Sequence, residues 1–343
     1  MITHFFIQVI KKKIEVFLLL AIFFTFHGNV YSQSHGLPSS FQEIIRGDNY
    51  IPMGISGFRY QIGSYYSISR KFYLSDETLV TPRTYKDYER YGVWSKIEKR
   101  VKDRFVLGLT IPFQVSDSYK DNAYFTPGDY KHTIFGDFDL FAGWEIIRNA
   151  KYALFSDLHW IIPANSNRAS KVDPYIYLGL DGHTGIKLNF SGAFNFTKDF
   201  SLNTSVSYLN TLPKTQVLIG GQRAIDLTGS SDSIVGEFNP RDVLNYMIKL
   251  NYKWSNSVGT FIGFERWFET TDTISNLQNI GNAEMATLNA ILEGPEGYLN
   301  YMFFGFKFPF IFESSIDILY KYPLSGSYAY NENIWAIAVQ KDI

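Results

Sequence analysis

Apolar and polar residues alternate with a period of two along most of the chain after about residue 55. Between residues 103 and 115, large apolar residues such as Leu107 and Ile111 occupy every second position, and Gly108 and Thr110 lie between them. Successive side chains of a β-strand point to opposite faces, so this period predicts strands with two unlike faces. The chain is therefore expected to be an all-β protein.

The alternation divides the chain into twelve expected strands separated by breaks. Single-chain bacterial outer-membrane barrels have an even number of antiparallel strands, and twelve fits that rule. The expected strands are residues 55–68, 88–99, 103–115, 134–147, 151–162, 184–197, 199–209, 244–255, 257–268, 298–308, 311–321 and 333–343.

The breaks between these strands alternate between long and short. The short ones lie at 99–102, 148–150, 198, 255–257 and 309, and the long ones at 69–87, 116–133, 163–183, 210–243, 269–297 and 322–332. Outer-membrane barrels join their strands by short periplasmic turns and long external loops. The pattern predicts a transmembrane antiparallel up-and-down β-barrel in the cell outer membrane, with membrane lipid as its surroundings.

The N-terminus has the features of a secretory signal peptide. Three lysines at 11–13 precede an apolar run at 16–26, and Val30-Tyr31-Ser32 offers a cleavage site before Gln33. A membrane anchor is the alternative, but the apolar run is short for a spanning helix. We expect a cleaved signal peptide over residues 1–32, an irregular lead-in over 33–54 and a transmembrane barrel over 55–343.

Composition narrows the class of protein further. Aromatic residues make up 17% of the chain, with 24 Tyr and 30 Phe, as suits the apolar band and aromatic girdles of a lipid-facing barrel. A formal net charge of −1 gives no support for nucleic-acid binding, which needs a basic surplus. The absence of cysteine excludes disulfides, thiolate metal sites and a cysteine nucleophile.

Several strands carry charge on their less apolar face. In a membrane barrel this face surrounds a lumen, and twelve strands about 4.8 Å apart and tilted by roughly 40° give a backbone radius of roughly 12 Å. Such a lumen would admit only small solutes or ions. The expected lumen-lining residues are Arg59, Arg90, Lys96, Asp137, Asp139, Glu145, Asp157, His159, Lys187, Lys249, Lys253, Glu265, Lys307, Glu313 and Asp317.

The order of these charges along the chain suggests two opposed walls. One wall is expected to be negative, because two adjacent strands carry Asp137, Asp139, Glu145 and Asp157. Strands further round carry the basic residues Lys187, Lys249 and Lys253. Rings of charged side chains tune the selectivity of channels. We therefore expect a facing positive wall and a transverse field.

Two groups of residues are candidates for chemical sites. Asp157 and His159 share a face and resemble part of a hydrolytic triad, but no serine at a fitting spacing accompanies them, so a hydrogen-bonded charge network is favoured. Asp137 and Asp139 supply too few oxygen ligands to specify a hard cation. No catalytic residue, metal site or cofactor is predicted.

Residues 136–145, Gly-Asp-Phe-Asp-Leu-Phe-Ala-Gly-Trp-Glu, and the later segments 212–213 and 218–221 resemble a transporter family of small outer-membrane barrels. That family is associated with meta-pathway phenol degradation. The resemblance covers about residues 100–225 and implies passage of small, hydrophobic solutes; it supplies no catalytic residues. The charged lumen is a departure that puts an apolar solute in doubt.

Three functions are consistent with these features. The first is a passive channel or transporter for small solutes, which an open lumen would favour. The second is a structural or partner-binding barrel with a plugged lumen. The third is a lipid-modifying enzyme, which would need a Ser–His pair near the outer rim.

Overall fold

The computed structural model describes most of the region expected to form the barrel. The signal peptide and lead-in expected over residues 1–54 lie outside the described residues, so both stay predictions. No helix within the described part of the chain is long and apolar enough to cross a membrane. The described residues are 58–73, 78–80, 87–102, 104–120, 130–134, 137–163, 183–219, 234–239, 242–255, 258–271, 273–278, 296–327 and 329–342.

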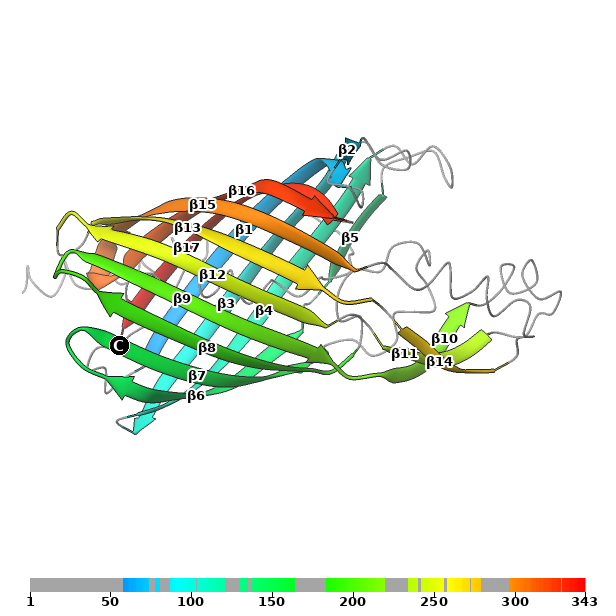
Figure 1. Cartoon of the computed structure of the whole chain (residues 1–343), viewed down its shortest axis with the longest axis horizontal. Coiled ribbons are helices and arrows are strands. Elements are labelled where there is room, and N and C mark those ends of the chain that lie inside the picture. The colour runs from blue at the N-terminus through cyan, green and yellow to red at the C-terminus, as the bar shows by residue number, and fades with distance from the viewer. Residues whose placement is uncertain are drawn as a thin grey trace, which may run out of the picture.

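Twelve long antiparallel strands form one closed barrel (Figure 1). Each pairs with its neighbours in chain order, and β1 pairs with β17 to close the cylinder. The strands are β1 (Phe58–Tyr73), β3 (Asp87–Lys102), β4 (Phe105–Lys120), β6 (Phe138–Arg148), β7 (Tyr152–Ile162), β8 (Gly185–Asn195), β9 (Phe200–Thr211), β12 (Val243–Lys253), β13 (Gly259–Glu269), β15 (Gly297–Pro309), β16 (Ser315–Ser327) and β17 (Ala329–Asp342). The expected fold class and strand number are confirmed.

Five shorter strands lie among the long connections. β2 (Leu79–Val80) pairs with β1, and β5 (Tyr130–Ile134) pairs with β4. β10 (Lys214–Ile219), β11 (Ile234–Asn239) and β14 (Thr273–Gln278) form a separate three-stranded sheet. Figure 1 shows all five at one end of the barrel, opposite the end with the tight turns and the C-terminus. The breaks expected over 210–243 and 269–297 thus contain secondary structure that the sequence did not predict.

The structure corrects two boundaries near the C-terminus. The long break expected over 322–332 is wrong, because β16 continues to Ser327 and β17 begins at Ala329. Pro323 lies beyond Lys321, the last residue of β16 that pairs with β17, so its missing N–H breaks no bond on that side. The strand expected over 311–321 begins instead at Ser315, because residues 311–313 form a 3-10 turn that contains Glu313.

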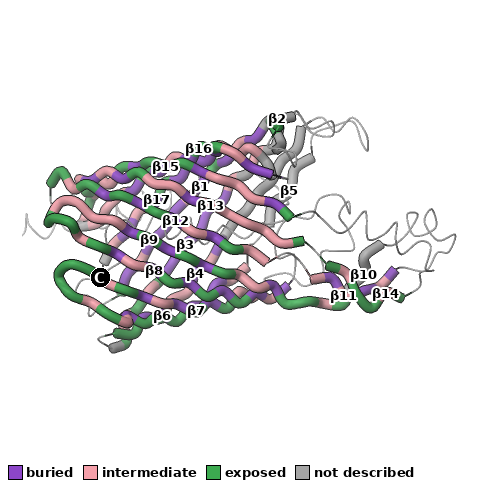
Figure 2. The backbone as a smooth tube through the Cα atoms, viewed as in Figure 1, coloured by how far each residue is buried: buried purple, intermediate pink, exposed green. Residues whose placement is uncertain are grey.

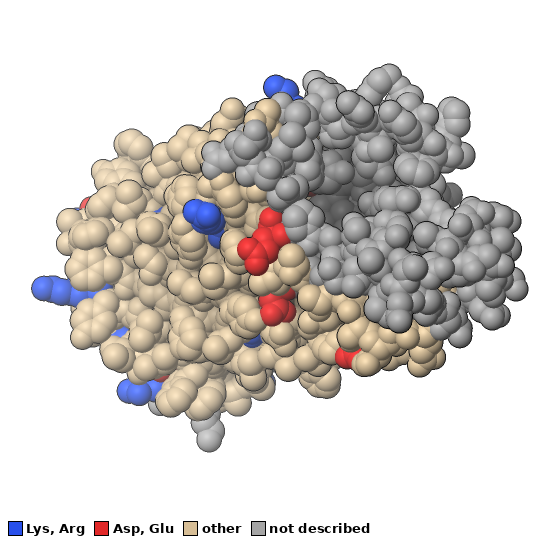
Figure 3. Space-filling view, turned by 45° about the vertical axis from the view of Figure 1, so that its right-hand side comes forward, with Lys and Arg blue, Asp and Glu red and all other residues tan. Residues whose placement is uncertain are grey.

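The two faces of the barrel wall differ in character (Figure 2). Along β8, exposed and buried residues alternate: Leu188 is 41% exposed and Asn189 is 0% exposed. Large exposed apolar side chains of this kind occur on every long strand, and Figure 3 shows a flank on which few charged side chains interrupt the uncharged surface. A closed barrel satisfies every backbone group within lipid. The chain is therefore a barrel of the outer membrane.

The tips of inward aromatic rings lie close to glycines of neighbouring strands. A Cβ built on Gly108 would lie 2.1 Å from the Phe141 ring, and one on Gly143 would lie 2.3 Å from the Phe155 ring. Only glycine permits so close an approach. The rings are thereby held against the wall.

Candidate functional site

The inner face of the barrel holds most of the charged residues predicted to line the lumen. Ten of them are buried: Arg59, Lys96, Asp139, Glu145, Asp157, His159, Lys187, Lys249, Glu265 and Asp317. Three others, Asp137, Lys253 and Lys307, are partly exposed. Arg90 lies on β3 and Glu313 in the 3-10 turn, and the side chains of both lie outside what the structure describes. Whether the buried charges line a path for solutes stays a proposal.

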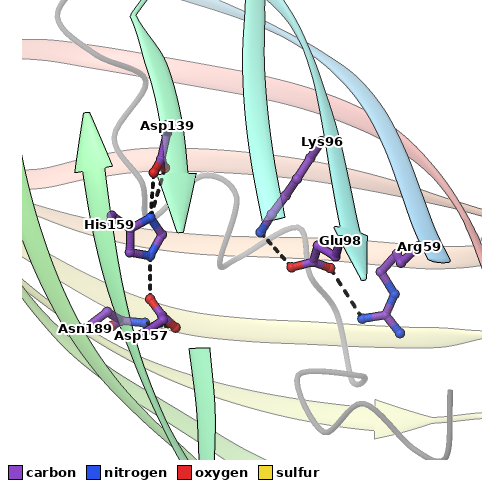
Figure 4. A network of polar contacts seen from close by, with 7 residues as sticks. All are labelled: Arg59, Lys96, Glu98, Asp139, Asp157, His159 and Asn189. Atoms are coloured by element: carbon purple, nitrogen blue, oxygen red, sulfur yellow. Dashed lines mark hydrogen bonds and ion pairs between the residues drawn. The ribbon is translucent and has the colours of Figure 1, made fainter. Parts of the chain in front are cut away.

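His159 connects two carboxylates inside the wall (Figure 4). Its Nδ1 lies 2.7 Å and 3.0 Å from the two carboxylate oxygens of Asp139, and its Nε2 contacts Asp157. The amide of Asn189 donates to the second oxygen of Asp157 over 3.2 Å. All four side chains are buried, so each polar group needs a partner within the protein.

A second network joins β3 to β1, and β4 separates it from the first (Figure 4). Lys96 Nζ lies 2.9 Å from a carboxylate oxygen of Glu98, and the other oxygen of Glu98 lies 3.9 Å from Arg59. On β6, Glu145 accepts hydrogen bonds from Arg100 over 2.9 Å and from Arg148 over 3.4 Å.

A third network lies across β12, β13 and β16. Glu265 forms an ion pair with Lys321 and accepts a hydrogen bond from the amide of Asn245 over 2.9 Å. The Nζ of Lys249, on β12, lies 5.2 Å from the centre of the Phe261 ring, within the range of a cation–π contact.

The strand register contradicts the expected separation into a negative wall and a positive wall. Lys187 on β8 is the direct cross-strand partner of His159, and His159 contacts Asp139 and Asp157. Lys187 therefore lies beside the acidic residues instead of facing them across the lumen. Sequence order misled because consecutive strands are neighbours in this barrel, so residues on successive strands meet rather than face each other.

An apolar cluster adjoins the third network, and sequence reasoning missed it. It contains ten buried residues from β1, β3, β12, β13, β15, β16 and β17: Tyr65, Trp94, Met247, Phe261, Tyr301, Phe303, Leu319, Ile334, Ala336 and Ala338. The sequence could have shown that β17 contributes to this cluster, because Ala336 and Ala338 alternate with larger lipid-facing residues. Apolar rings and buried charges thus lie next to each other here, as Lys249 over the Phe261 ring shows.

Small polar side chains cover the inner face of β8, β9 and β12, the face that the alternation of the sequence assigns to the lumen, although they were not among the expected lumen-lining residues. In the circular strand order β8 lies six strands from β17, and β9 lies six strands from β1, so β8 and β9 face two of the strands that contribute to the apolar cluster. On β8 and β12 these residues lie at every second position from Lys187 and Lys249, and this alternation places them on the same inward face. The buried members are Asn189, Ser191, Asn203, Ser205, Ser207, Asn245 and Asn251.

The described residues offer little for catalysis or metal binding. They contain no group of three or more His, Asp or Glu side chains that could hold a metal ion. Both ring nitrogens of His159 face carboxylates, whereas a general base needs one nitrogen directed at a nucleophile.

Comparison with known proteins places the fold among outer-membrane barrels. No family model matches the chain, and no curated protein matches it in sequence. The COG4313 outer membrane channel from Pseudomonas putida F1 is similar in structure, with a TM-score of 0.63, 12% identity, and coverage of 86% of this chain and 98% of that one.

Two further solved structures are similar over most of their length. The transport unit of the autotransporter AIDA-I from Escherichia coli has a TM-score of 0.49 and 9% identity, with 91% of this chain and 100% of that one covered. A FadL homologue from Pseudomonas aeruginosa has a TM-score of 0.41 and 10% identity, with 92% and 100% covered. Both scores are below 0.5, whereas the likeness to the COG4313 channel is above that value and concerns the fold alone. Together with the apolar outer face, it identifies the chain as an outer-membrane β-barrel.

Proposed function

We propose that the barrel is a passive channel for small solutes, with a narrow interior lined by charged and hydrogen-bonding side chains. The observation that carries this proposal is the inversion of the two faces of the wall. Apolar side chains face lipid, while Lys187, Asn189, Lys249 and their neighbours point inward. Burying so many polar groups costs stability that an apolar interior would avoid, and a polar inner face suits the passage of small polar solutes.

A plugged, partner-binding barrel is the second candidate, and one observation favours it. Trp94, Phe303 and Leu319 are each 0% exposed, so side chains pack closely around part of the interior. The three-stranded sheet of β10, β11 and β14 beyond the barrel would then offer a surface to a partner.

Conductance of the purified full-length protein in planar lipid bilayers tests the channel. We expect small, discrete conductance steps, lower than those of a sixteen-strand porin measured alongside, because the barrel has only twelve strands. An electrically silent bilayer, despite verified insertion of folded protein, would refute the channel and support the plugged barrel.

Ion selectivity tests whether the acidic residues border the path. Replacing Asp137 and Asp139 together with Asn should shift the reversal potential in a KCl gradient toward anion preference. Asp199, in the turn between β8 and β9, provides a matched Asp→Asn control that should leave the potential unchanged. Conductance with the same selectivity in all variants would show that Asp137 and Asp139 do not border the path.

The resemblance to barrels associated with meta-pathway phenol degradation suggests a finer proposal, that the solutes are small and partly hydrophobic. The apolar cluster around Trp94 and Phe303 supports it, and the buried charges restrict it to solutes that also carry polar groups. We further propose that the chain is not an enzyme, that a signal peptide over residues 1–32 is removed, and that 33–54 is a lead-in. Mass spectrometry of the protein purified from the outer membrane should find Gln33 at its N-terminus.

A further inference from the structure

Exposed basic residues gather at the end of the barrel where the tight turns lie. They come from three consecutive turns, which join β3 to β4, β6 to β7 and β8 to β9, and these six strands are neighbours in the wall. We call them the basic rim, and its members are Lys99, Arg104, Lys151 and Lys198.

The surroundings of Lys99 show that the basic rim borders the lipid face of the wall. Its cross-strand neighbours are Phe58 on β1 and Leu107 on β4, and both are exposed. Its Nζ lies 4.7 Å from the centre of the Phe58 ring, within the range of a cation–π contact. An ammonium group is costly in hydrocarbon, so a lysine near a membrane boundary extends its charged end to the headgroups. The headgroup layer therefore lies at the level of the Lys99 ammonium group.

Aromatic rings mark the same level on the neighbouring strands. Phe105 at the start of β4 stacks on Trp144 of β6, with ring centres 5.8 Å apart. Phe196 stacks on Phe200 at the turn that holds Lys198. Phe105, Trp144 and Phe196 are exposed, as are the aromatic residues that line the boundary between hydrocarbon and headgroups in other membrane proteins. The basic rim therefore lies beside an aromatic belt, at the depth of the lipid phosphates.

The carboxylates at this end of the barrel do not neutralise the basic rim. Glu145 pairs with two arginines of the inner face, and Glu98 pairs with Lys96. Within the described part of the chain, no ion pair joins a member of the basic rim to a carboxylate. Even when Asp199, the neighbour of Lys198 in the chain, is counted, the rim keeps a net positive charge.

Acidic residues are more common at the opposite end of the described wall. Asp242, Glu269 and Glu296 lie where β12, β13 and β15 meet the long connections. Figure 3 shows acidic side chains beside the loop end and basic ones at the end with the tight turns. In an outer-membrane barrel the tight turns are periplasmic, so the basic rim faces the headgroups of the periplasmic leaflet.

We propose that the basic rim binds anionic phospholipid headgroups of the periplasmic leaflet, with phosphatidylglycerol as the representative lipid. The three ammonium groups and the Arg104 guanidinium meet lipid phosphates, and a guanidinium can donate two parallel hydrogen bonds to one phosphate. The acyl chains of the same lipids then lie along the aromatic and aliphatic side chains of the outer face. The rim would bind lipid whether or not the barrel conducts solutes.

Electron paramagnetic resonance of spin-labelled lipids measures the preference of the barrel for one headgroup over another. The purified full-length protein is placed in phosphatidylcholine bilayers, and its association with labelled phosphatidylglycerol is compared with that of labelled phosphatidylcholine. A cation at the membrane surface favours an anionic headgroup at its own site by about fivefold. Wild-type protein should therefore prefer phosphatidylglycerol, and replacing all four members of the rim with Gln should remove more than half of that preference. Molar salt should weaken the preference of wild-type protein in the same way, because it screens exposed charges.

A lysine at the other end of the barrel supplies the matched control. Lys71 is also exposed but lies at the external end of β1, so Lys71→Gln should leave the preference unchanged, whereas Lys151→Gln should lower it. These side chains are exposed, so the variants should fold, and circular dichroism checks that they do. No preference in wild-type protein, or an undiminished preference in the four-residue variant, would refute the lipid site. An equal loss from Lys71→Gln and Lys151→Gln would refute its place at the periplasmic rim.

Discussion

Replacing His159 with leucine should destabilise the barrel strongly, because His159 is the link between two buried carboxylates. Its Nδ1 lies 2.7 Å from Asp139 and its Nε2 contacts Asp157. Asp139 is 8% exposed and Asp157 is 1% exposed. Leucine would leave both carboxylates facing an apolar side chain.

The expected magnitude follows from the geometry. Removing one member of a buried ionic network costs about 3–5 kcal/mol of stability, chiefly because the remaining charge stays buried without a partner. Asn189 still donates to Asp157, so the lower half of that range applies to this carboxylate. Adding Asp139→Asn and Asp157→Asn to His159→Leu removes both charges, so we expect the triple variant to recover more than half of the loss.

Urea unfolding of the barrel in phospholipid vesicles, followed by tryptophan fluorescence, measures these free energies. The control is Asn203→Leu, which removes a buried polar side chain without leaving a charge. A loss below about 1 kcal/mol for His159→Leu would contradict the reasoning, since it would place the carboxylates in contact with water rather than in a buried network. So would a triple variant no more stable than the single one.

Two other predictions concern the wall itself, and the same unfolding assay measures both. Leu188→Arg on the lipid face should lower the free energy of unfolding by about 2–4 kcal/mol, whereas Tyr152→Arg at the periplasmic end of β7 should lower it by about 1 kcal/mol or less. Equal losses would mean that the inferred position of the barrel in the membrane is wrong. A Cβ at Gly263 would lie 2.3 Å from the Phe303 ring and 2.4 Å from a backbone oxygen, whereas one at Gly192 would meet nothing within 3.4 Å. Gly263→Ala should therefore cost about 1–3 kcal/mol and Gly192→Ala about 0.5 kcal/mol or less, and the reverse order would refute this account of the close packing.

The strands and their two faces were readable from the sequence, because side-chain direction in a strand is a local property of the backbone. Leu188 and Asn189 belong to opposite faces in any strand that contains both. The expected break over 322–332 was wrong, because local pattern does not show where a strand stops pairing with its neighbour. β16 continues to Ser327, because Pro323 lies beyond the part of β16 that pairs with β17 and its missing N–H breaks no bond there.

Which side chains meet inside the barrel depends on how the strands pair and in what register. Alternation placed Asp139, His159 and Lys187 on one face of their strands, but only the register showed that they are neighbours rather than opposed walls. The same holds for Asn189, Ser207 and Asn245, which lie far apart in the chain and meet in one row. The three-stranded sheet of β10, β11 and β14 likewise joins two separate connections.

The amino-acid sequence by itself therefore determined that this protein is a twelve-strand outer-membrane barrel. The alternation within each strand and the length of each break can be read directly from consecutive residues, without knowing which strands pair. Only the tertiary structure decided which inward side chains touch, because those contacts join residues tens of positions apart, as from Asp157 to Asn189. The register sets them, and a shift of one residue in any strand would move its inward set to the lipid face.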